Sequence, residues 1–175
     1  MPSSLPAVFF RGGAFLAIFA VLQGTWREAR GSWLERLVID DLTVGSAVSI
    51  IEFATPAVRA VADGSHIRAP GGGINILNGC EGIEIIFLLV AALCVFPASW
   101  RQRFLGIGTG TLFIFALNQV RILALFYAYR ADKALFGLLH GTVAPVAMIA
   151  CTVVFLLLWT KVGAGGTASN APAGA

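Results

Sequence analysis

An unbroken apolar run over residues 85–93 constrains this chain more than any other feature of its sequence. It lies within a longer apolar window, residues 82–100, and about 20 such residues are needed for a helix to cross the hydrocarbon core of a bilayer. Three further windows of similar length cover residues 8–26, 104–127 and 141–160. Because 58% of the residues are hydrophobic and only 12% are charged, the chain has too few polar residues for a soluble domain. We therefore predict an all-α integral membrane protein with about four transmembrane helices.

Basic residues in the short loops predict the orientation of these spans. The loop between the second and third spans carries Arg101 and Arg103 without an acidic residue, which places it in the cytoplasm. Four spans then put both termini inside and leave residues 27–81 and 128–139 outside. We accordingly expect a multi-pass protein of the cell inner membrane.

The outer segment, residues 27–81, is expected to hold an amphipathic helix that lies on the membrane surface. Its expected apolar face consists of Trp33, Leu34, Leu37, Val38 and Leu42. A fifth span over residues 42–62 is disfavoured because it would place Glu52 in the hydrocarbon core and Pro56 inside the helix.

Two further segments complete the expected organisation. Residues 58–77 consist of short extended pieces interrupted by turn sequences, which favours a hairpin against the membrane surface. The first apolar window lacks a small-residue cleavage site and is expected to be a retained span. Residues 163–175 are rich in Gly, Ala and Ser and are expected to be disordered, so that residues 1–162 form a single membrane domain.

Arg121 is the most costly residue within a predicted span, since an Arg at a helix centre costs about 2.5 to 3.5 kcal/mol on insertion scales. It lies roughly 9 Å from the predicted outer end of its helix. Two interpretations remain open. Its side chain extends to the membrane surface, or it faces an internal polar site. Asn118, three residues earlier on the same helix face, favours the second interpretation.

Cys80 lies where the outer segment enters the second span. A thiol at a helix amino terminus lies near the positive end of the helix dipole, which favours the nucleophilic thiolate. Glu81 and Glu84 oppose this effect unless they are paired or turned aside. Cys94 and Cys151 lie mid-span among aliphatic residues and are expected to be inert. No CxxC spacing is present, so neither a metal site nor a cofactor is expected.

His140 opens the last span, where a histidine on its own is most simply an interfacial residue. The predicted orientation, however, places Cys80, Arg121 and His140 at the same outer face although they belong to different spans. A nucleophile, a base and a fixed cation form the minimum set for thiol acyl transfer. His140 would take the thiol proton, Cys80 would attack a carbonyl carbon, and Arg121 would stabilise the oxyanion. His66, in the expected hairpin, is more simply a solvated residue.

Three short motifs in this order resemble the exosortase/archaeosortase family of membrane-embedded cysteine transpeptidases. They are Cys80-Glu81-Gly82 at the head of one span, Asn118-Gln119-Val120-Arg121 near the outer end of the next, and His140 at the start of the last. The resemblance covers roughly residues 65–150. The chain resembles a short form of the family, and it has a Glu after the Cys where many members carry a small or polar residue.

The resemblance implies that Cys80 is the nucleophile and that Arg121 and His140 are its catalytic partners. The residues expected to support them or to bind substrate are Asn118, Glu81 and Gly82. The implied substrates are exported proteins with a carboxy-terminal sorting tail, made of a short motif, a transmembrane helix and a basic end. Membrane lipid is the other expected partner, and the active site is expected at the extracytoplasmic face.

Two other classes of function are compatible with the composition. In a transporter subunit or a polysaccharide-assembly factor, Asn118 and Arg121 would line a polar path. Such proteins often show internal repeats and polar sites at mid-depth, and this sequence shows neither. A membrane acyltransferase using His140 is disfavoured because no acidic residue lies near that histidine. The net charge of +3 fits basic inner loops, and no feature indicates nucleic-acid binding.

Overall fold

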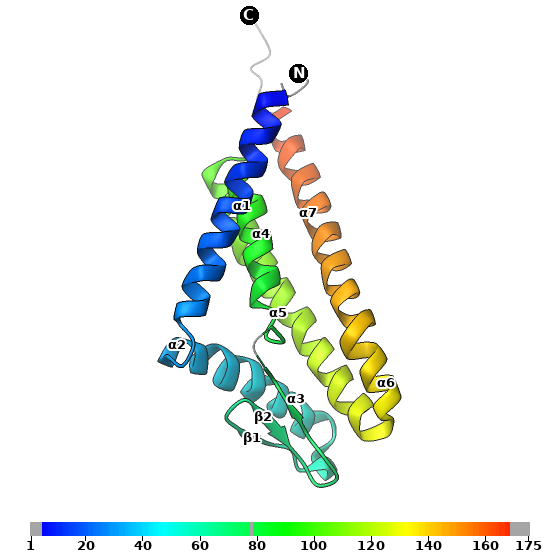
Figure 1. Cartoon of the computed structure of the whole chain (residues 1–175). Coiled ribbons are helices and arrows are strands. Elements are labelled where there is room, and N and C mark those ends of the chain that lie inside the picture. The colour runs from blue at the N-terminus through cyan, green and yellow to red at the C-terminus, as the bar shows by residue number, and fades with distance from the viewer. Residues whose placement is uncertain (1–4, 78, 169–175) are drawn as a thin grey trace, which may run out of the picture.

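The computed structural model describes residues 5–77 and 79–168, with side chains described through Lys161 (Figure 1). Four helical segments form the membrane part. They are α1 (Leu5–Glu28), α4 (Ile83–Val95), α5 (Trp100–Ala131) and the continuous run of α6 (Lys133–Leu138), η3 (Leu139–Val143) and α7 (Ala144–Ala168). Between α1 and α4 the chain forms an outer module. Its elements are α2 (Trp33–Arg36), η1 (Leu37–Gly45), α3 (Ser46–Ala54), η2 (Pro56–Val58), β1 (Val61–Asp63), β2 (His66–Arg68) and β3 (Ile74–Asn75).

Three of the described helical segments are long and apolar enough to cross a membrane. They are Leu5–Glu28, Trp100–Ala131 and Lys133–Lys161. The fourth, α4, is apolar but has only 13 residues, or about 20 Å of helix. The second span is therefore helical over a shorter range than the expected residues 82–100. Pro97 accounts for the difference, because it disfavours helical geometry in the residue before it and lacks a backbone donor.

Packing against α5 establishes the direction of this shorter helix. A Cβ on Gly82 would contact Asn118 of α5, and a Cβ on Gly106 would contact Leu93 of α4, so the two helices run antiparallel. From Asn118 back to the start of α5 the distance is about 27 Å, close to the thickness of a hydrocarbon core of about 30 Å. Helix α4 accounts for about 20 Å of this length. The all-α membrane architecture expected from the sequence is confirmed.

The long helices place the start of α1 and the end of α7 on one side of the molecule. In Figure 1 the start of α1 and the end of α7 lie at the same end as the turn between α4 and α5, whereas the sheet and α6 lie at the other. This arrangement is the one that an even number of crossings produces. Which end faces the cytoplasm stays a prediction from Arg101 and Arg103.

Two helices extend further outward than the apolar windows indicated. Helix α5 ends at Ala131 rather than near residue 127, and the next helix begins at Lys133 rather than near residue 141, so the expected loop over residues 128–139 is mostly helical. Contacts with the outer module explain the extension. Arg130 donates hydrogen bonds to the carbonyl oxygens of Pro70 (2.8 Å) and Gly72 (3.0 Å).

The carboxyl end differs from expectation as well. Helix α7 continues to Ala168, so residues 163–168 are helical where a disordered tail was expected. The remainder of that expected tail, residues 169–175, lies outside the described residues.

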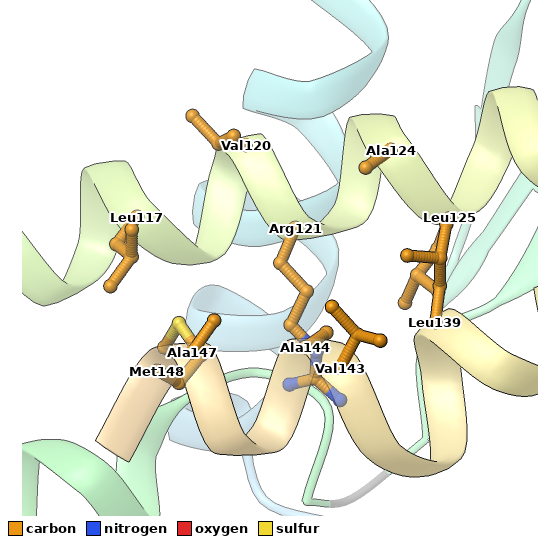
Figure 2. A pocket seen from close by; sticks show the side chains of 10 residues that line it. All are labelled: Leu117, Val120, Arg121, Ala124, Leu125, Leu139, Val143, Ala144, Ala147 and Met148. Atoms are coloured by element: carbon orange, nitrogen blue, oxygen red, sulfur yellow. The ribbon is translucent and has the colours of Figure 1, made fainter. Parts of the chain in front are cut away.

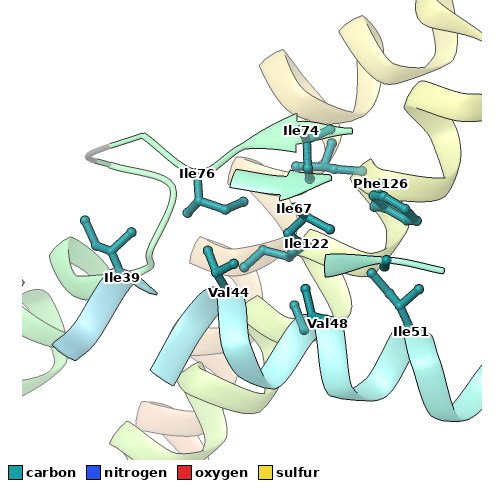
Figure 3. Close-up of a cluster of buried hydrophobic side chains, with 12 residues drawn as sticks. Ile39, Val44, Val48, Ile51, Ile67, Ile74, Ile76, Ile122 and Phe126 are labelled. Atoms are coloured by element: carbon teal, nitrogen blue, oxygen red, sulfur yellow. The ribbon is translucent and has the colours of Figure 1, made fainter. Parts of the chain in front are cut away.

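Within the outer module, α2, η1 and α3 form one continuous helical rod over residues 33–54. This rod packs on a small sheet and on the outer part of α5. Strands β1, β2 and β3 form an antiparallel sheet in that order, with Ala62 opposite Ile67 and Ile67 opposite Ile74. This arrangement confirms the expected hairpin and adds a third strand. Figure 3 shows the shared core, whose labelled members are Ile39, Val44, Val48, Ile51, Ile67, Ile74, Ile76, Ile122 and Phe126.

The residues expected to face the membrane surface lie outside the protein core. Trp33 (70% exposed), Leu34, Leu37 and Leu42 are exposed, and only Val38 of the expected face is partly buried. Within the rod, the segment η1 is π-helical, so its backbone bonds run from residue i to i+5. Each residue there rotates the chain about the helix axis by a smaller angle than in an α-helix. Over nine residues the accumulated rotation is roughly 0.4 of a turn smaller than an α-helix would give.

Apolar residues near both ends of the rod are exposed. Trp33 and Leu37 precede most of η1, whereas Ile50 and Phe53 (92% exposed) follow it. The rod thus exposes apolar side chains before and after η1, while others, among them Val44 and Ile51, are buried in the core.

Candidate active site

The candidate site lies where the turn before α4 meets the middle of α5, between two apolar cores. On the outer side is the core of Figure 3. On the membrane side is a second cluster of buried side chains, formed by Leu89, Leu93, Ile114 and Met148. Cys80 packs at the margin of the outer core and is partly buried, whereas Asn118 is completely buried. A polar site thus occupies the boundary between the membrane-spanning part and the outer module.

Arg121 and Cys80 are in direct contact although they are 41 residues apart in sequence. Arg121 Nη2 lies 3.8 Å from Cys80 Sγ, and Nη1 lies 3.5 Å from the carbonyl oxygen of Cys80. The same Nη1 is 3.5 Å from Asn118 Oδ1. The guanidinium is thus directed at the cysteine turn and at Asn118. This geometry favours the inward-facing interpretation of Arg121 over extension along the lipid to the membrane surface.

The turn that carries Cys80 is shaped by backbone bonds and one glycine. The amide of Cys80 donates to the carbonyl of Leu77 (2.9 Å), and Gly82 adopts a left-handed conformation (φ 80°) as the N-cap of α4. The first helical residue is Ile83, so the thiol lies just before the helix rather than within its first turn. The amino terminus of α4, with its unpaired N–H groups, is nevertheless close to the turn.

Glu81, next to the cysteine, is buried and points toward α1. Its Oε1 accepts a hydrogen bond from Trp26 Nε1 (3.2 Å), and its Oε2 accepts one from the amide of Gly79. Glu84, by contrast, is exposed. The carboxyl group of Glu81, paired as the sequence analysis required, is thus engaged by donors of its own.

Trp26 was not identified from the sequence as a site residue. In the sequence it serves only as the aromatic boundary of the first apolar window, and 55 positions separate it from Glu81. An indole N–H needs a partner when it is buried, and Trp26 is 8% exposed. This requirement was the signal that the sequence offered for a role of Trp26, but it does not specify which residue accepts the hydrogen bond.

His140 is placed near the site but is not joined to it. It lies in the π-helical segment η3, is exposed, and stacks on Phe136 with ring centroids 5.4 Å apart. Its neighbours Leu139 and Val143 line a cavity that Arg121 also lines (Figure 2). Among the residues that the structure describes, no hydrogen bond links the imidazole to Cys80 or to Arg121.

Several buried polar atoms around the site have no hydrogen-bond partner in the described part of the chain. They are Nδ2 of Asn118, both amide atoms of Gln119, and Nε of Arg121. Such atoms are uncommon in folded proteins, because each unpaired group costs about 1 to 3 kcal/mol. Gln119 belongs to the motif that carries Asn118 and Arg121, but sequence reasoning assigned it no role. These atoms leave hydrogen-bonding capacity free beside the thiol.

The remaining candidates for site chemistry are distributed elsewhere. All three cysteines are free, and Cys94 and Cys151 are partly buried in α4 and α7. His66 is exposed on β2. Within residues 5–77 and 79–168, no group of three His, Cys, Asp or Glu residues is arranged to hold a metal ion. The chemistry that the site offers is that of a thiol beside a fixed cation.

Apolar membrane helices around a partly buried thiol–guanidinium pair define a membrane-embedded protein with a candidate cysteine site. The chain matches the family model described as transmembrane exosortase over residues 8–157, and it therefore belongs to this family. Membership supports, in general terms, a transpeptidase-type role in the membrane, and the family is generally cysteine peptidase-like. A search of the curated proteins and a search of the solved structures each found no match.

Proposed function

We propose that this protein is a membrane cysteine peptidase or transpeptidase that cleaves the carboxy-terminal sorting tail of exported proteins. The observation that carries the proposal is the contact between Arg121 and Cys80, because it pairs a nucleophile with a fixed donor of two hydrogen bonds. The substrate tail would consist of a short motif, a transmembrane helix and a basic end. The reaction would take place at the extracytoplasmic face of the inner membrane.

In the proposed reaction His140 takes the proton of the Cys80 thiol, and the sulfur attacks the carbonyl carbon of the scissile peptide bond. The carbonyl oxygen becomes an oxyanion, which the guanidinium of Arg121 stabilises. When the carbon–nitrogen bond breaks, the leaving amine takes the proton from His140, and a thioester joins Cys80 to the substrate. Attack on this thioester by water releases a carboxylic acid, whereas attack by an amine of an envelope acceptor completes a transfer.

The proposed reaction requires the side chain of His140 to change its orientation. Its imidazole stacks on Phe136 and has no hydrogen bond in the described part of the chain, so it must turn toward Cys80 when substrate binds. The π-helical geometry of η3 supports such a role, since π-helical turns occur frequently at functional sites. Asn118 and Glu81 take supporting roles, Asn118 by holding the guanidinium and Glu81 by tying the cysteine turn to α1.

The test uses a tagged exported protein with a sorting tail, co-expressed with variants of this chain. Cys80→Ala and Cys80→Ser are expected to abolish the gel shift that accompanies cleavage of the tail. Cys94→Ala and Cys151→Ala serve as matched controls and are expected to process the substrate normally, because both thiols lie away from the Arg121 guanidinium. Immunoblots of membranes establish that every variant accumulates. Cleavage that persists without the Cys80 thiol would rule out the thiol mechanism.

A further inference from the structure

An apolar cavity of about 170 Å³ lies between α5 and the α6–η3–α7 segment, and Arg121 is its one charged lining residue (Figure 2). The other lining side chains are apolar and include Leu117, Ala124, Leu139, Val143 and Ala147. Figure 2 shows Arg121 leaving α5 toward the segment that carries Val143 and Ala144. The aliphatic part of the arginine thus forms one wall of the cavity, while its guanidinium contacts the Cys80 turn.

Of the three residues in the proposed reaction, Arg121 lines the cavity itself, and the other two lie next to residues or groups that do. The cavity wall includes Arg121, whose Nη2 is 3.8 Å from Cys80 Sγ, and it includes Leu139 and Val143 on both sides of His140 in sequence. A carbonyl group attacked by Cys80 and stabilised by Arg121 would lie at the edge of this cavity. The side chain of the residue that bears the carbonyl begins only two bonds from the carbonyl carbon, so it is the substrate group nearest to the cavity.

Size and polarity determine which side chain the cavity would accept. An apolar cavity of about 150 Å³ can hold a molecule of the size of benzene, so 170 Å³ is enough for one branched aliphatic or aromatic side chain. A carboxylate or amide would lose its hydration against the aliphatic wall without gaining partners there. Ala124 and Ala147 are exposed at the rim, where a larger side chain would fill the opening.

We propose that this cavity is a specificity pocket, which binds an apolar side chain of the substrate residue whose carbonyl group Cys80 attacks. The inference rests on the proposed function and adds the chemical class of that residue: Val, Leu or Phe rather than Gly or a charged residue. Ala124 and Ala147 set the size of the pocket. They act by leaving room for the substrate and not by touching the reacting atoms.

The experiment measures how fast Cys80 is alkylated by small peptidyl probes in nanodiscs. The protein carries Cys94→Ala and Cys151→Ala, and the probes are acetyl-amino-acid chloromethyl ketones with Gly, Val, Leu, Phe or Asp as the amino acid. Each probe forms a thioether with Cys80 as chloride leaves, and intact mass spectrometry follows the reaction. Iodoacetamide, which has no side chain, measures the intrinsic reactivity of the thiol, and every rate is divided by it.

The expected result is that the Leu and Phe probes react about 10-fold or more faster than the Gly probe, and that the Asp probe gains nothing. Ala147→Leu and Ala124→Leu are expected to remove this preference, so that the normalised rates of the Leu and Phe probes fall to that of the Gly probe in the same variant. Ala150→Leu in α7 and Ala116→Leu in α5 are the matched controls. Both alanines are exposed on the same helices and lie outside the cavity lining, so the preference should persist in these variants.

Several results would contradict the assignment of this cavity as a specificity pocket. One is a preference for the Leu and Phe probes that persists in both Ala147→Leu and Ala124→Leu. Another is a loss of this preference to the same extent in the two control variants. A third is a phospholipid that co-purifies with the parent protein and is lost on Ala147→Leu without any change in probe preference, because the cavity would then hold lipid. Uniform rates for all probes would also overturn it. The processing assay with Cys80→Ala then decides separately whether the proposed function stands.

Discussion

Asn118 of α5 packs directly against Gly82. A Cβ atom added to the glycine would lie 3.1 Å from Asn118 Cγ and 3.3 Å from Asn118 Cβ. Asn118 also accepts from Arg121, and Gly82 stands two residues after Cys80. The close approach therefore fixes the distance between the cysteine turn and the helix that supplies the guanidinium. A residue without a side chain is needed at this position for the thiol and the cation to meet.

Gly82→Ala is expected to destabilise the fold by about 1 to 3 kcal/mol, because alanine is strained at φ 80° and its methyl group would press on Asn118. The thiol should move away from Arg121 as the turn shifts, and processing of substrate should fall. Denaturant unfolding in micelles, followed by circular dichroism, measures the first effect. Gly137→Ala in α6 is the matched control, since nothing lies within 4 Å of its Cβ position, and it should leave stability equal or slightly higher.

Arg121→Lys separates a catalytic role for the arginine from a merely structural one. Lysine keeps the charge and can reach the membrane surface, but it lacks the planar pair of donors directed at the Cys80 turn. If Arg121 stabilises the oxyanion, the variant should insert normally and form the acyl-enzyme about 10²- to 10³-fold more slowly. Single-turnover rates in nanodiscs provide the measurement. Rates close to the parent for both Arg121→Lys and Arg121→Ala would remove the arginine from the mechanism.

The orientation in the membrane can be tested at two exposed positions at opposite ends of the molecule. In a background with all three native cysteines replaced, Ala62→Cys on β1 should react with a membrane-impermeant maleimide in intact spheroplasts. Pro97→Cys, in the turn before Arg101 and Arg103, should react only after the membrane is permeabilised. The reverse pattern would place the Cys80 turn on the cytoplasmic side and contradict the assignment of the site to the outer face.

The sequence was sufficient to predict the membrane helices and to nominate candidate site residues, because both depend on local properties. Hydropathy locates spans well, and one arginine within an apolar helix is conspicuous at any position. The parity of the crossings then placed Cys80 and Arg121 at one level, and their contact is consistent with that deduction. Family membership, deduced from three short motifs, was likewise confirmed by the match over residues 8–157.

What the sequence could not predict depends on contacts between distant segments. Trp26 pairs with Glu81 from another helix, and Arg130 extends α5 by binding carbonyl groups of the sheet connection. Neither partner is specified by local propensity. The stacking of His140 on Phe136 is also a tertiary feature, and it leaves the assignment of His140 as the base a prediction. The burial of Val44 and Ile51 in a core shared with the sheet and α5 is a further tertiary feature that the local sequence does not specify.

The π-helical segment η1 has a consequence for changes in chain length. Its two wide turns contain more residues than two turns of α-helix would need, so the rod can lose a residue there and still keep its buried residues in the core by tightening to α-helical geometry. Deletion of exposed Asp41 in η1 should therefore be tolerated, whereas deletion of exposed Ser49 in α3 would rotate Ile51 out of the core by about 100°. Natural length variation in this module should accordingly concentrate within Leu37–Gly45, the one stretch of the rod where an indel leaves the fold's register intact.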